Sequence, residues 1–431
     1  MKPIWLLLAL FTIGCSERGS GGGDPSEVGG SAGSTTGSGA GTSAAGGQAG
    51  AGAGSAGLGG AHDGGAGGAA GGTTSGGAGG AGGGGVEPGL RDYLLDPAFP
   101  DTFWETASLQ ESGIDPEPID QALDRIAAEG WEIHSFLIAR NGRLVLEQYG
   151  WDSGQLPVDP ARAAHQVLPD ERHALFSTTK SVLSALVGIA MEEGFITTLD
   201  QPIADWFSDY ASLNPSPEKS LITFEDLLTM RSGLEWSEGD QSTFEAPDPA
   251  RAMLSRPVVD LPVGEVWNYS SGGSDIVAEI LRTATGATPL AYASEKLFGP
   301  IGIDDPPWTA GQNGTHHGGW GLSLTSREMA RFGELFRNRG AWDEEQIVPA
   351  AWTDASTTPR CATPWGMQYA YHWWVPNLQG FFSTIGAFGQ QIFVSREHRL
   401  VIVFTAHLPS EQANSIYEEL LRTYVLPALV D

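Results

Sequence analysis

Residues 177–191 read Ser-Thr-Thr-Lys-Ser-Val-Leu-Ser-Ala-Leu-Val-Gly-Ile-Ala-Met, a short polar stretch that passes into an almost wholly apolar one. The apolar side chains would cover most faces of a helix rather than a single stripe, and a helix of that kind lies buried inside its domain. Gly194, just beyond this stretch, is a typical helix stop. The sequence therefore predicts a buried helix that begins at Ser177 and carries Lys180 in its first turn.

Segments with strand character lie on both sides of this helix in the sequence. Two β-type runs flank Asn141-Gly142, which is a strong signal for a hairpin. Residues 391–395 and 399–405 read as two further strands. Helical patterns occur at 118–130, 223–230, 275–283, 326–337 and 411–424. Strands at both ends with helices between them predict an α+β fold, in which an antiparallel β-sheet is flanked by helices and accompanied by an all-helical lobe.

The first fifteen residues have the pattern of an export signal. Lys2 precedes a mostly apolar run that ends in Thr12-Ile-Gly-Cys15, which resembles a bacterial lipobox with Thr in place of the usual Leu. This pattern predicts a lipoprotein-type signal peptide over 1–15, with Cys15 as the lipidated residue. The alternative is an ordinary signal peptide that is cut near Gly14.

Residues 16–87 consist largely of Gly, Ala and Ser. Such a segment has few side chains to bury, so it is predicted to be a disordered linker, which leaves 88–431 as the folded domain. A lipid anchor followed by a tether predicts a protein exported across the bacterial inner membrane. We expect the anchor to hold it in a membrane, at the outer membrane, in the periplasm or at the cell surface.

The charge and the cysteines exclude several classes of function. A net charge of −29 argues against binding to nucleic acid and against a basic patch for anionic lipid. Cys15 and Cys361 are the two cysteines, and the sequence has neither a C-x-x-C motif nor the spacing of zinc ligands. We therefore expect no metal and no cofactor, and we interpret Cys361 as a structural thiol.

Two motifs could mark a nucleophilic serine. G-x-S-x-G at 29–33 lies in the low-complexity linker, without the strand and helix that a nucleophile elbow requires, so we attribute it to chance. The motif S-x-x-K occurs twice in a chain with four lysines. Ser216 and Lys219 lie in a polar, proline-rich stretch, which favours an exposed loop. Ser177 and Lys180 lie at the start of the buried helix, where positions i and i+3 share one face.

Burial gives the Ser177–Lys180 pair a possible chemistry. Desolvation lowers the pKa of a lysine and favours its neutral amine, and the positive end of the helix dipole acts in the same direction. A neutral amine beside a hydroxyl is a base beside a nucleophile. The structural alternative is a helix N-cap serine followed by a lysine that extends to solvent. From this segment alone, both interpretations stand.

Four segments decide between them. They are 175–182 (Leu-Phe-Ser-Thr-Thr-Lys-Ser-Val), 222–234 (Ile-Thr-Phe-Glu-Asp-Leu-Leu-Thr-Met-Arg-Ser-Gly-Leu), 262–271 (Pro-Val-Gly-Glu-Val-Trp-Asn-Tyr-Ser-Ser) and 318–333 (Gly-Gly-Trp-Gly-Leu-Ser-Leu-Thr-Ser-Arg-Glu-Met-Ala-Arg-Phe-Gly). In this order they resemble the serine β-lactamase-like hydrolases, in the class C-like branch that includes esterases, D-amino-acid amidases and 6-aminohexanoate-dimer hydrolases. The resemblance implies that 88–431 is a serine hydrolase domain for a small-molecule ester or amide.

The resemblance also assigns roles to individual side chains. Ser177 is the nucleophile, Lys180 is its base, and Tyr269 relays protons with the lysine. The charge of Lys180 would lower the pKa of the Tyr269 phenol. On sequence grounds alone, Tyr269 could be a half-buried aromatic residue before a helix. Ser271 stands where the family motif Y-x-N has Asn, a feature of the 6-aminohexanoate-dimer hydrolase-like members, and we assign it to the substrate-binding residues.

Residues 384–386 (Thr-Ile-Gly) stand where β-lactamases have the motif K-T-G. Thr384 replaces the lysine. We assign Thr384, by its place in the motif, and Gly386 to the substrate-binding residues, and a glycine lets the backbone approach a substrate closely. By resemblance, the Ala387 N–H joins that of Ser177 as the oxyanion hole. The missing lysine argues against a β-lactamase or D-alanyl-D-alanine carboxypeptidase, which is the alternative activity. An inactive binding module with the same fold is the second alternative.

Three histidines are further candidates. His316 and His317 are adjacent, and adjacent side chains seldom converge on one target, so we expect a loop or surface role for both. His372 precedes Trp373-Trp374, and we interpret it as part of a pocket wall.

Overall fold

The computed structural model describes residues 91–92, 104–155, 163–240 and 242–430. The predicted signal peptide, Cys15 and the linker lie outside these described residues. Within them, no helix combines the length and the apolar character needed to cross a membrane.

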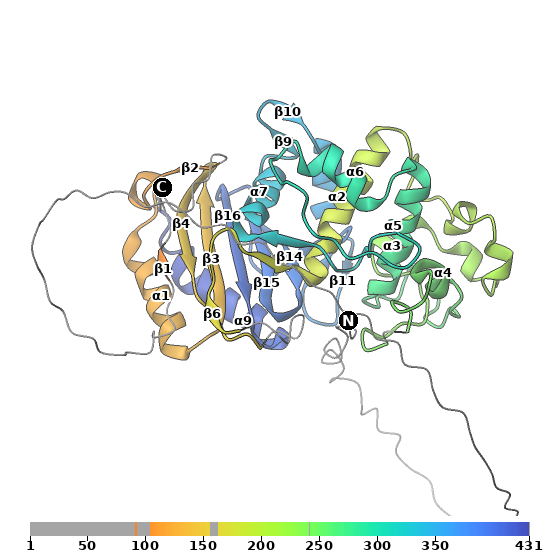
Figure 1. Cartoon of the computed structure of the whole chain (residues 1–431), viewed down its shortest axis with the longest axis horizontal. Coiled ribbons are helices and arrows are strands. Elements are labelled where there is room, and N and C mark those ends of the chain that lie inside the picture. Colours follow the sequence, from red (N-terminus) through yellow and green to blue (C-terminus); the bar gives the residue numbers. More distant parts are fainter. Residues whose placement is uncertain (1–90, 93–103, 156–162, 241, 431) are drawn as a thin grey trace, which may run out of the picture. The chain divides into compact units, whose positions relative to one another are not determined.

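A ten-stranded sheet forms the centre of the domain, in the order β1-β4-β3-β16-β15-β14-β13-β12-β11, with β2 beside β4 (Figure 1). Its strands are β1 Arg91–Asp92, β2 Glu105–Thr106, β3 Ile133–Arg140, β4 Arg143–Tyr149, β11 Cys361–Ala362, β12 Gln368–Tyr369, β13 Trp374–Val375, β14 Phe381–Gly386, β15 Gln390–Ser395 and β16 Leu400–Ala406. The predicted hairpin is β3–β4, and β16 pairs with β3, so strands from the early and late parts of the described residues share one sheet. Among the described strands of this sheet, β2 alone pairs in parallel, with β4, so the predicted antiparallel sheet is confirmed with that exception.

Helices cover both faces of the sheet. On one face, α1 (Pro116–Glu129) and α9 (Ser410–Leu420) share a core with Ile402 of β16. On the other face, α2 (Thr179–Glu192) and α7 (Ser326–Arg337) share a core with Val401 and Val403. The two cores alternate along β16 because successive side chains of a strand point to opposite faces.

The predicted helical lobe is present, to the right of the sheet in Figure 1. It contains α3 (Phe224–Leu228), α4 (Pro249–Leu254), α5 (Ser271–Thr285) and α6 (Pro289–Ala293), with a π-helical turn at Ser294–Phe298. Helix α2 packs against α5 and joins the lobe to the sheet. The fold predicted from the sequence is therefore the observed one.

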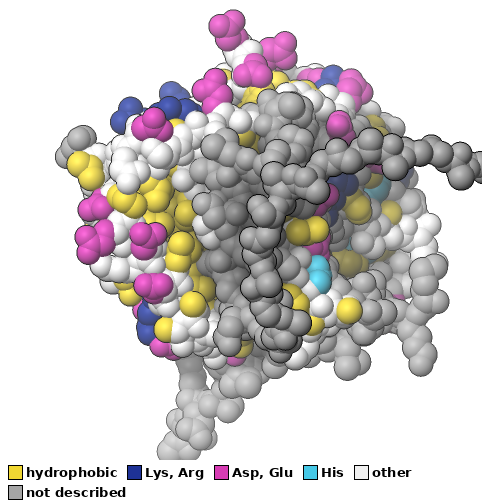
Figure 2. Space-filling view, turned by 60° about the vertical axis from the view of Figure 1, so that its left-hand side comes forward, with side chains coloured by type: hydrophobic (Ala, Val, Ile, Leu, Met, Phe, Trp, Pro, Cys, Tyr) yellow, Lys and Arg dark blue, Asp and Glu magenta, His cyan; other side chains and the backbone are white. Residues whose placement is uncertain are grey.

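The remaining elements are short. They are β5 Trp151–Asp152, β6 His165–Gln166, β7 Arg172–Ala174, β8 Ser323–Thr325, β9 Ala341–Trp342, β10 Glu345–Gln346, α8 Ala350–Thr357, and helical turns at Gln110–Ser112, Phe176–Thr178, Ile203–Trp206, Tyr210–Ser212, Lys219–Leu221, Ala387–Gly389 and Leu421–Val425. On the face shown in Figure 2, acidic side chains are spread over the described surface, in line with the net charge of −29.

Local signals explain where the helices begin. Helix α7 starts with a capping box, in which the Thr325 side chain accepts from the Glu328 N–H and Glu328 bonds back to the Thr325 N–H. Helix α2 is buried from Thr179 to Ala190, as its apolar sequence predicts. It begins at Thr179 rather than at Ser177, because a 3₁₀ turn over Phe176–Thr178 precedes it.

Candidate active site

Ser177 lies in the turn between strand β7 and helix α2. The preceding residue, Phe176, has a φ of 49°, in the left-handed region that bulky residues rarely adopt. Such strain concentrates at functional sites, where the surrounding structure holds it in place. The turn places the Oγ of Ser177 at 3.1 Å from the Nζ of Lys180, one turn further along.

Lys180 is buried and its amine has three acceptors. Besides Ser177 Oγ, Nζ contacts Ser271 Oγ at 2.8 Å and the Gly319 carbonyl oxygen at 2.9 Å. Burial lowers the pKa of Lys180 from its ordinary 10.5 to about 8, against the opposing effect of the Glu238 and Asp275 carboxylates. The amine is therefore close to the balance point between its charged and neutral forms.

Tyr269 is buried beside Lys180, whose Nζ lies 4.7 Å from the centre of the phenol ring. The expected direction of its pKa shift is wrong. Burial and the nearby Glu238 carboxylate raise the pKa of Tyr269 well above 10, although a side-chain hydrogen bond with Ser177 acts in the other direction. Tyr269 is therefore a protonated phenol that can share a hydrogen bond with the nucleophile.

Ser271 is the first residue of α5, and its side chain faces Lys180 and Glu238. The Ser271 hydroxyl donates to Glu238 Oε2 at 2.8 Å, and the Ser271 backbone N–H donates to Glu238 Oε1 at 2.7 Å. Glu238 is buried and was not a sequence candidate. It lies 33 positions before Ser271, in a loop without a motif, so no local pattern marks it.

Gly318 and Gly319 bring a backbone carbonyl to the lysine. A Cβ at Gly319 would lie 2.9 Å from the Cβ of Ser271, so only glycine lets this segment approach α5 so closely. The Gly318 N–H donates to Asp275 Oδ1 at 2.8 Å, which fixes the segment against the helix. The glycine pair was part of the family-like segment 318–333, but its contact with Lys180 was not predicted.

Strand β14 brings Thr384 and Gly386 beside the serine turn. The hydroxyl of Thr178 donates to Thr384 Oγ1 at 3.1 Å, and Thr384 Oγ1 also accepts the Ile392 N–H at 3.0 Å. Thr384 is fully buried, so it joins the turn to the sheet. A Cβ at Gly386 would lie 2.3 Å from the Leu175 carbonyl oxygen, which makes this another close backbone approach.

Ala387 follows Gly386 in the helical turn Ala387–Gly389. It packs with Phe388 and with Phe176, the neighbour of Ser177. The structure therefore brings Ser177, Lys180, Tyr269, Ser271, Thr384, Gly386 and Ala387 to one region, where β14 meets the starts of α2 and α5.

The second S-x-x-K motif, at Ser216 and Lys219, was expected in an exposed loop, and the structure contradicts this expectation. Lys219 is 1% exposed, and its Nζ donates to the carbonyl oxygens of Leu213, Asn214 and Leu254 at 2.6–3.0 Å. Burial lowers the pKa of Lys219. Ser216 Oγ accepts from the Lys219 backbone N–H rather than from the amine. Both lysines are buried, and their different partners distinguish them.

The histidines have structural partners. His317 Nδ1 is 3.2 Å from Asp275 Oδ2, and the His317 ring stacks on Trp320 at 4.3 Å. His372 is 1% exposed, and its Nε2 is 3.4 Å from Ser274 Oγ. Burial and the nearby Lys180 lower the pKa of His372 to about 3. His372 is thus a neutral core residue behind α2, which corrects its interpretation as a pocket wall.

Aromatic side chains surround Tyr269. The rings of Trp267, Trp365, Tyr369 and Trp374 have centroids 5.7–6.4 Å from the Tyr269 ring. Trp365 is 48% exposed, whereas Trp374 beneath it is buried, and the two rings stack at 5.6 Å. An apolar surface therefore leads from solvent to the phenol.

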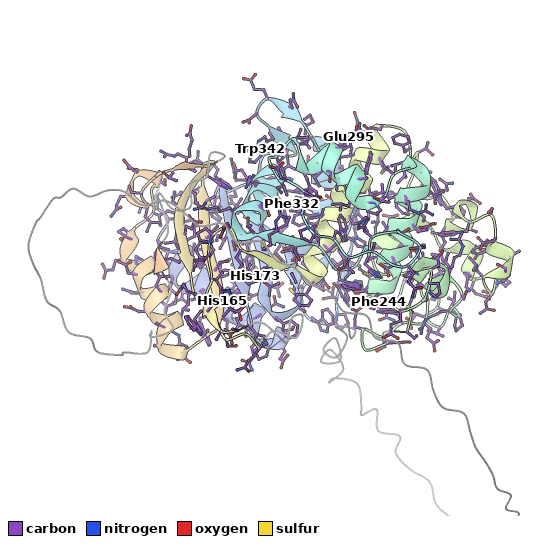
Figure 3. All side chains as sticks on the ribbon, viewed as in Figure 1. His165, His173, Phe244, Glu295, Phe332 and Trp342 are labelled. Atoms are coloured by element: carbon purple, nitrogen blue, oxygen red, sulfur yellow. The ribbon has the colours of Figure 1, made fainter. Side chains whose placement is uncertain are left out.

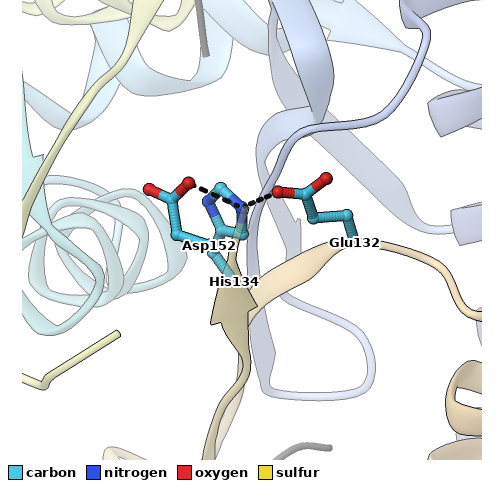
Figure 4. A group of neighbouring side chains, drawn as sticks. All are labelled: Glu132, His134 and Asp152. Atoms are coloured by element: carbon cyan, nitrogen blue, oxygen red, sulfur yellow. Dashed lines mark hydrogen bonds and ion pairs between the residues drawn. The ribbon is translucent and has the colours of Figure 1, made fainter. Parts of the chain in front are cut away.

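Glu132, His134 and Asp152 form a separate titratable cluster. Figure 4 shows the His134 ring between the two carboxylates, with Nε2 at 3.3 Å from Glu132 and 4.0 Å from Asp152. The three ligand atoms lie within 4.8 Å of one another, a spacing that a cation could bridge. Burial would raise the pKa of Glu132, but hydrogen bonds from His134, His407 and Ser153 outweigh it and lower that pKa. These hydrogen bonds already occupy the Glu132 carboxylate, so we interpret the cluster as a hydrogen-bonded structural group.

Comparisons with known proteins give the family of the chain and agree with its fold. The model of the Beta-lactamase family matches residues 123–423. The 6-aminohexanoate-dimer hydrolase of Paenarthrobacter ureafaciens is 26% identical over 300 residues, which are 64% of this chain and 72% of that protein. A solved Bacillus anthracis structure assigned to the 6-aminohexanoate-dimer hydrolases has a TM-score of 0.60 at 22% identity, covering 78% of this chain and 90% of that one. A family VIII carboxylesterase has a TM-score of 0.55 at 18% identity, covering 71% and 98%.

Proposed function

Because the chain belongs to the Beta-lactamase family, we propose that it is a serine hydrolase that cleaves an ester or an amide through an acyl-enzyme on Ser177. One observation carries the proposal: the amine of a buried lysine, with a pKa of about 8, lies 3.1 Å from the Ser177 hydroxyl. A base needs this contact and a pKa near the working pH. A lysine that extended to solvent would have neither property.

The proposed reaction has two halves. Neutral Lys180 takes the proton of Ser177 as Oγ forms a bond to the substrate carbonyl carbon, and the N–H groups of Ser177 and Ala387 hold the oxyanion. The bond to the leaving group then breaks, and that group receives the proton from Lys180, with Tyr269 as a relay. Water then gives a proton to the same amine as its oxygen attacks the acyl carbon, the bond between that carbon and Ser177 Oγ breaks, and Lys180 returns the proton to Oγ as the acid leaves.

The surroundings of Tyr269 favour an apolar substrate. Trp365 and Trp374 offer flat ring faces next to the phenol. Thr384, in place of the lysine of K-T-G, carries no charge for a substrate carboxylate, and its hydroxyl is already bonded to Thr178. An uncharged ester or amide with an apolar or aromatic group fits these features better than a β-lactam or a D-alanyl peptide. β-Lactamase or D-alanyl-D-alanine carboxypeptidase activity is therefore the second candidate.

The test uses the full chain and its Ser177→Ala variant. We expect a fluorophosphonate probe to label Ser177, and the variant to lose p-nitrophenyl butyrate turnover. No adduct on Ser177, together with full turnover by Ser177→Ala, would refute the proposal. Nitrocefin turnover that depends on Ser177 would favour the second candidate. The inactive binding module predicts neither labelling nor turnover.

The N-terminal sequence supports a lipid anchor. We propose that Cys15 is lipidated and holds the chain in a bacterial membrane after export. Expression of the full chain and of Cys15→Ala tests this, since only the unsubstituted chain should sediment with membranes. Equal release of both into the soluble fraction would contradict the proposal.

A further inference from the structure

The hydroxyl of Ser271 takes part in two hydrogen bonds, one with Lys180 and one with Glu238. Its Oγ lies 2.8 Å from Lys180 Nζ and 2.8 Å from Glu238 Oε2. The Ser271 hydroxyl has a single hydrogen, and it donates that hydrogen to Glu238 Oε2. The Ser271 oxygen therefore accepts from Lys180 and does not donate to it.

This direction fixes the orientation of the amine. The Gly319 carbonyl oxygen, 2.9 Å from Nζ, is also only an acceptor. Two N–H bonds of Lys180 are thus committed to Ser271 and Gly319. The third position on the nitrogen faces Ser177 Oγ, and in the neutral amine this position is the lone pair. The lone pair then points at the proton that it has to remove.

We propose that Glu238 is a positioning residue for this proton transfer, which directs the lone pair of Lys180 at Ser177 by holding the hydroxyl hydrogen of Ser271. The inference rests on the proposed function of Ser177 and Lys180 and deepens it. Glu238 acts through Ser271 and has no direct part in bond making or breaking.

The surroundings of Glu238 hold its carboxylate in one orientation. Oε1 accepts the Ser271 backbone N–H at 2.7 Å and the indole N–H of Trp236 at 2.6 Å. The Trp236 ring packs edge-on against Phe244, with ring centroids 5.4 Å apart. Figure 3 shows Phe244 in the helical lobe. Glu238 is itself only 7% exposed. Two donors on Oε1 leave Oε2 directed at the Ser271 hydroxyl.

The identity of Ser271 explains why a second group is needed. An Asn side chain at this place would present a carbonyl oxygen, which can only accept from the lysine. A serine hydroxyl rotates and can either donate or accept, so it could take the lone pair of Lys180 away from Ser177. Glu238 removes that possibility.

Charge and orientation have opposite effects, so an experiment can separate them. The groups that face Lys180 are the carboxylates of Glu238 and Asp275, the phenol of Tyr269 and the imidazole of His372. Loss of the Glu238 charge lowers the pKa of Lys180, which moves the acidic limb of the rate profile to lower pH. Loss of orientation lowers the plateau rate at high pH.

Glu238→Gln is the decisive variant. In this variant, the Trp236 indole N–H and the Ser271 backbone N–H keep the amide oxygen of the new side chain at the position of Oε1, because both need an acceptor. The new NH₂ group therefore faces Ser271 Oγ. Ser271 then turns its hydrogen to Lys180 and occupies the lone pair. We expect the plateau kcat for p-nitrophenyl butyrate to fall on the order of 100-fold, while the acidic limb moves to lower pH. A plateau within about threefold of the unsubstituted enzyme would overturn the proposal.

Three further variants complete the test. Ser271→Ala removes the hydroxyl through which Glu238 is proposed to act and one of the two acceptors that orient the Lys180 amine. Once this hydroxyl is absent, adding Glu238→Gln should change the plateau kcat by less than about threefold. Losses that multiply in the double variant would overturn the proposal. If thermal unfolding shows that Glu238→Gln is not folded, Ser271→Ala decides alone, and an unchanged plateau counts against the proposal.

Glu279→Gln is the matched control, because it also removes a buried carboxylate, in this case one on α5. Glu279 bonds to Arg282 and Thr315, away from the lysine contacts, and its variant should keep the plateau. An equal loss in Glu279→Gln would assign the effect to buried charge and overturn the proposal. Full turnover by Ser177→Ala is a different result, since it refutes the proposed function itself.

Discussion

Phe176 and Phe388 meet edge to face, with ring centroids 5.2 Å apart, and both have a left-handed backbone, with φ of 49° and 62°. Phe176 precedes Ser177 and Phe388 follows Ala387, the two residues whose N–H groups we propose as the oxyanion hole. Each strained residue costs about 1–3 kcal/mol, so the ring contact helps to retain both conformations. The pair joins the serine turn to the end of β14.

Phe388→Gly removes the ring but accepts the positive φ, so it tests the contact without adding strain. We expect kcat to fall on the order of tenfold and KM to change less, because the two N–H groups lose their fixed separation. Steady-state kinetics with p-nitrophenyl butyrate measure this. Phe195→Ala, at an exposed phenylalanine, is the control and should keep kcat. An unchanged kcat in Phe388→Gly would show that the contact between the two rings does not position the N–H groups of the oxyanion hole.

The pH profile reports the state of Lys180. Since the neutral amine is the proposed base and its pKa is about 8, kcat/KM should rise with pH along a limb with an apparent pKa near 8. Tyr269, with a raised pKa, stays protonated over this range. Initial rates between pH 6 and pH 9.5 measure the limb. A flat profile across this interval would contradict the role of the lysine as base.

The same pKa affects stability. Lys180 titrates near 8 in the folded chain and near 10.5 when unfolded, so the unfolded state binds more protons between these values. The free energy of unfolding should therefore rise with pH, relative to Lys180→Met, by about 2–3 kcal/mol between pH 8 and pH 10.5. Urea unfolding of both proteins measures the difference. A difference that does not vary with pH would show that the pKa of Lys180 is not depressed.

Lys219 shows where the sequence pattern was insufficient. The polar, proline-rich neighbourhood of Lys219 indicated an exposed loop, yet its amine binds three carbonyl oxygens in the core. Those oxygens belong to residues up to 35 positions away, and composition near the lysine does not report them. Burial therefore did not distinguish Lys180 from Lys219. The family-like segments around Ser177 and Tyr269 did.

Local signals predicted the fold well. Helix α7 has the predicted bounds because its capping box lies within four residues, at Thr325 and Glu328. Helix α5 begins at Ser271, before the predicted 275, because Ser270 caps a first turn that contains two glycines and has no apolar pattern. Glu238 lies in a segment without a recognisable pattern, so its contact with Ser271 could not be predicted. Gly319 lies in the family-like segment 318–333, but nothing in that segment indicates that its carbonyl oxygen contacts Lys180, 139 positions away.

Lys219→Met tests the structural role of the second lysine. It leaves three buried carbonyl oxygens without their donor, which should lower the free energy of unfolding by about 3 kcal/mol. The kcat of the folded fraction should stay unchanged, in contrast to Lys180→Met. Urea unfolding and ester turnover of both variants provide the comparison. Loss of turnover at unchanged stability in Lys219→Met would reverse the assignment of the two lysines.

Gly386→Ala tests the close approach of β14 to the serine turn. The added Cβ would lie 2.3 Å from the Leu175 carbonyl oxygen, a backbone atom two residues before Ser177. The turn has to move away from the strand, which separates the Ser177 and Ala387 N–H groups, so we expect kcat to fall on the order of 100-fold. Gly286→Asn is the matched control, because its φ of 72° suits Asn and a Cβ there meets nothing within 4 Å. If both variants keep full turnover of p-nitrophenyl butyrate, the strand end does not hold the oxyanion.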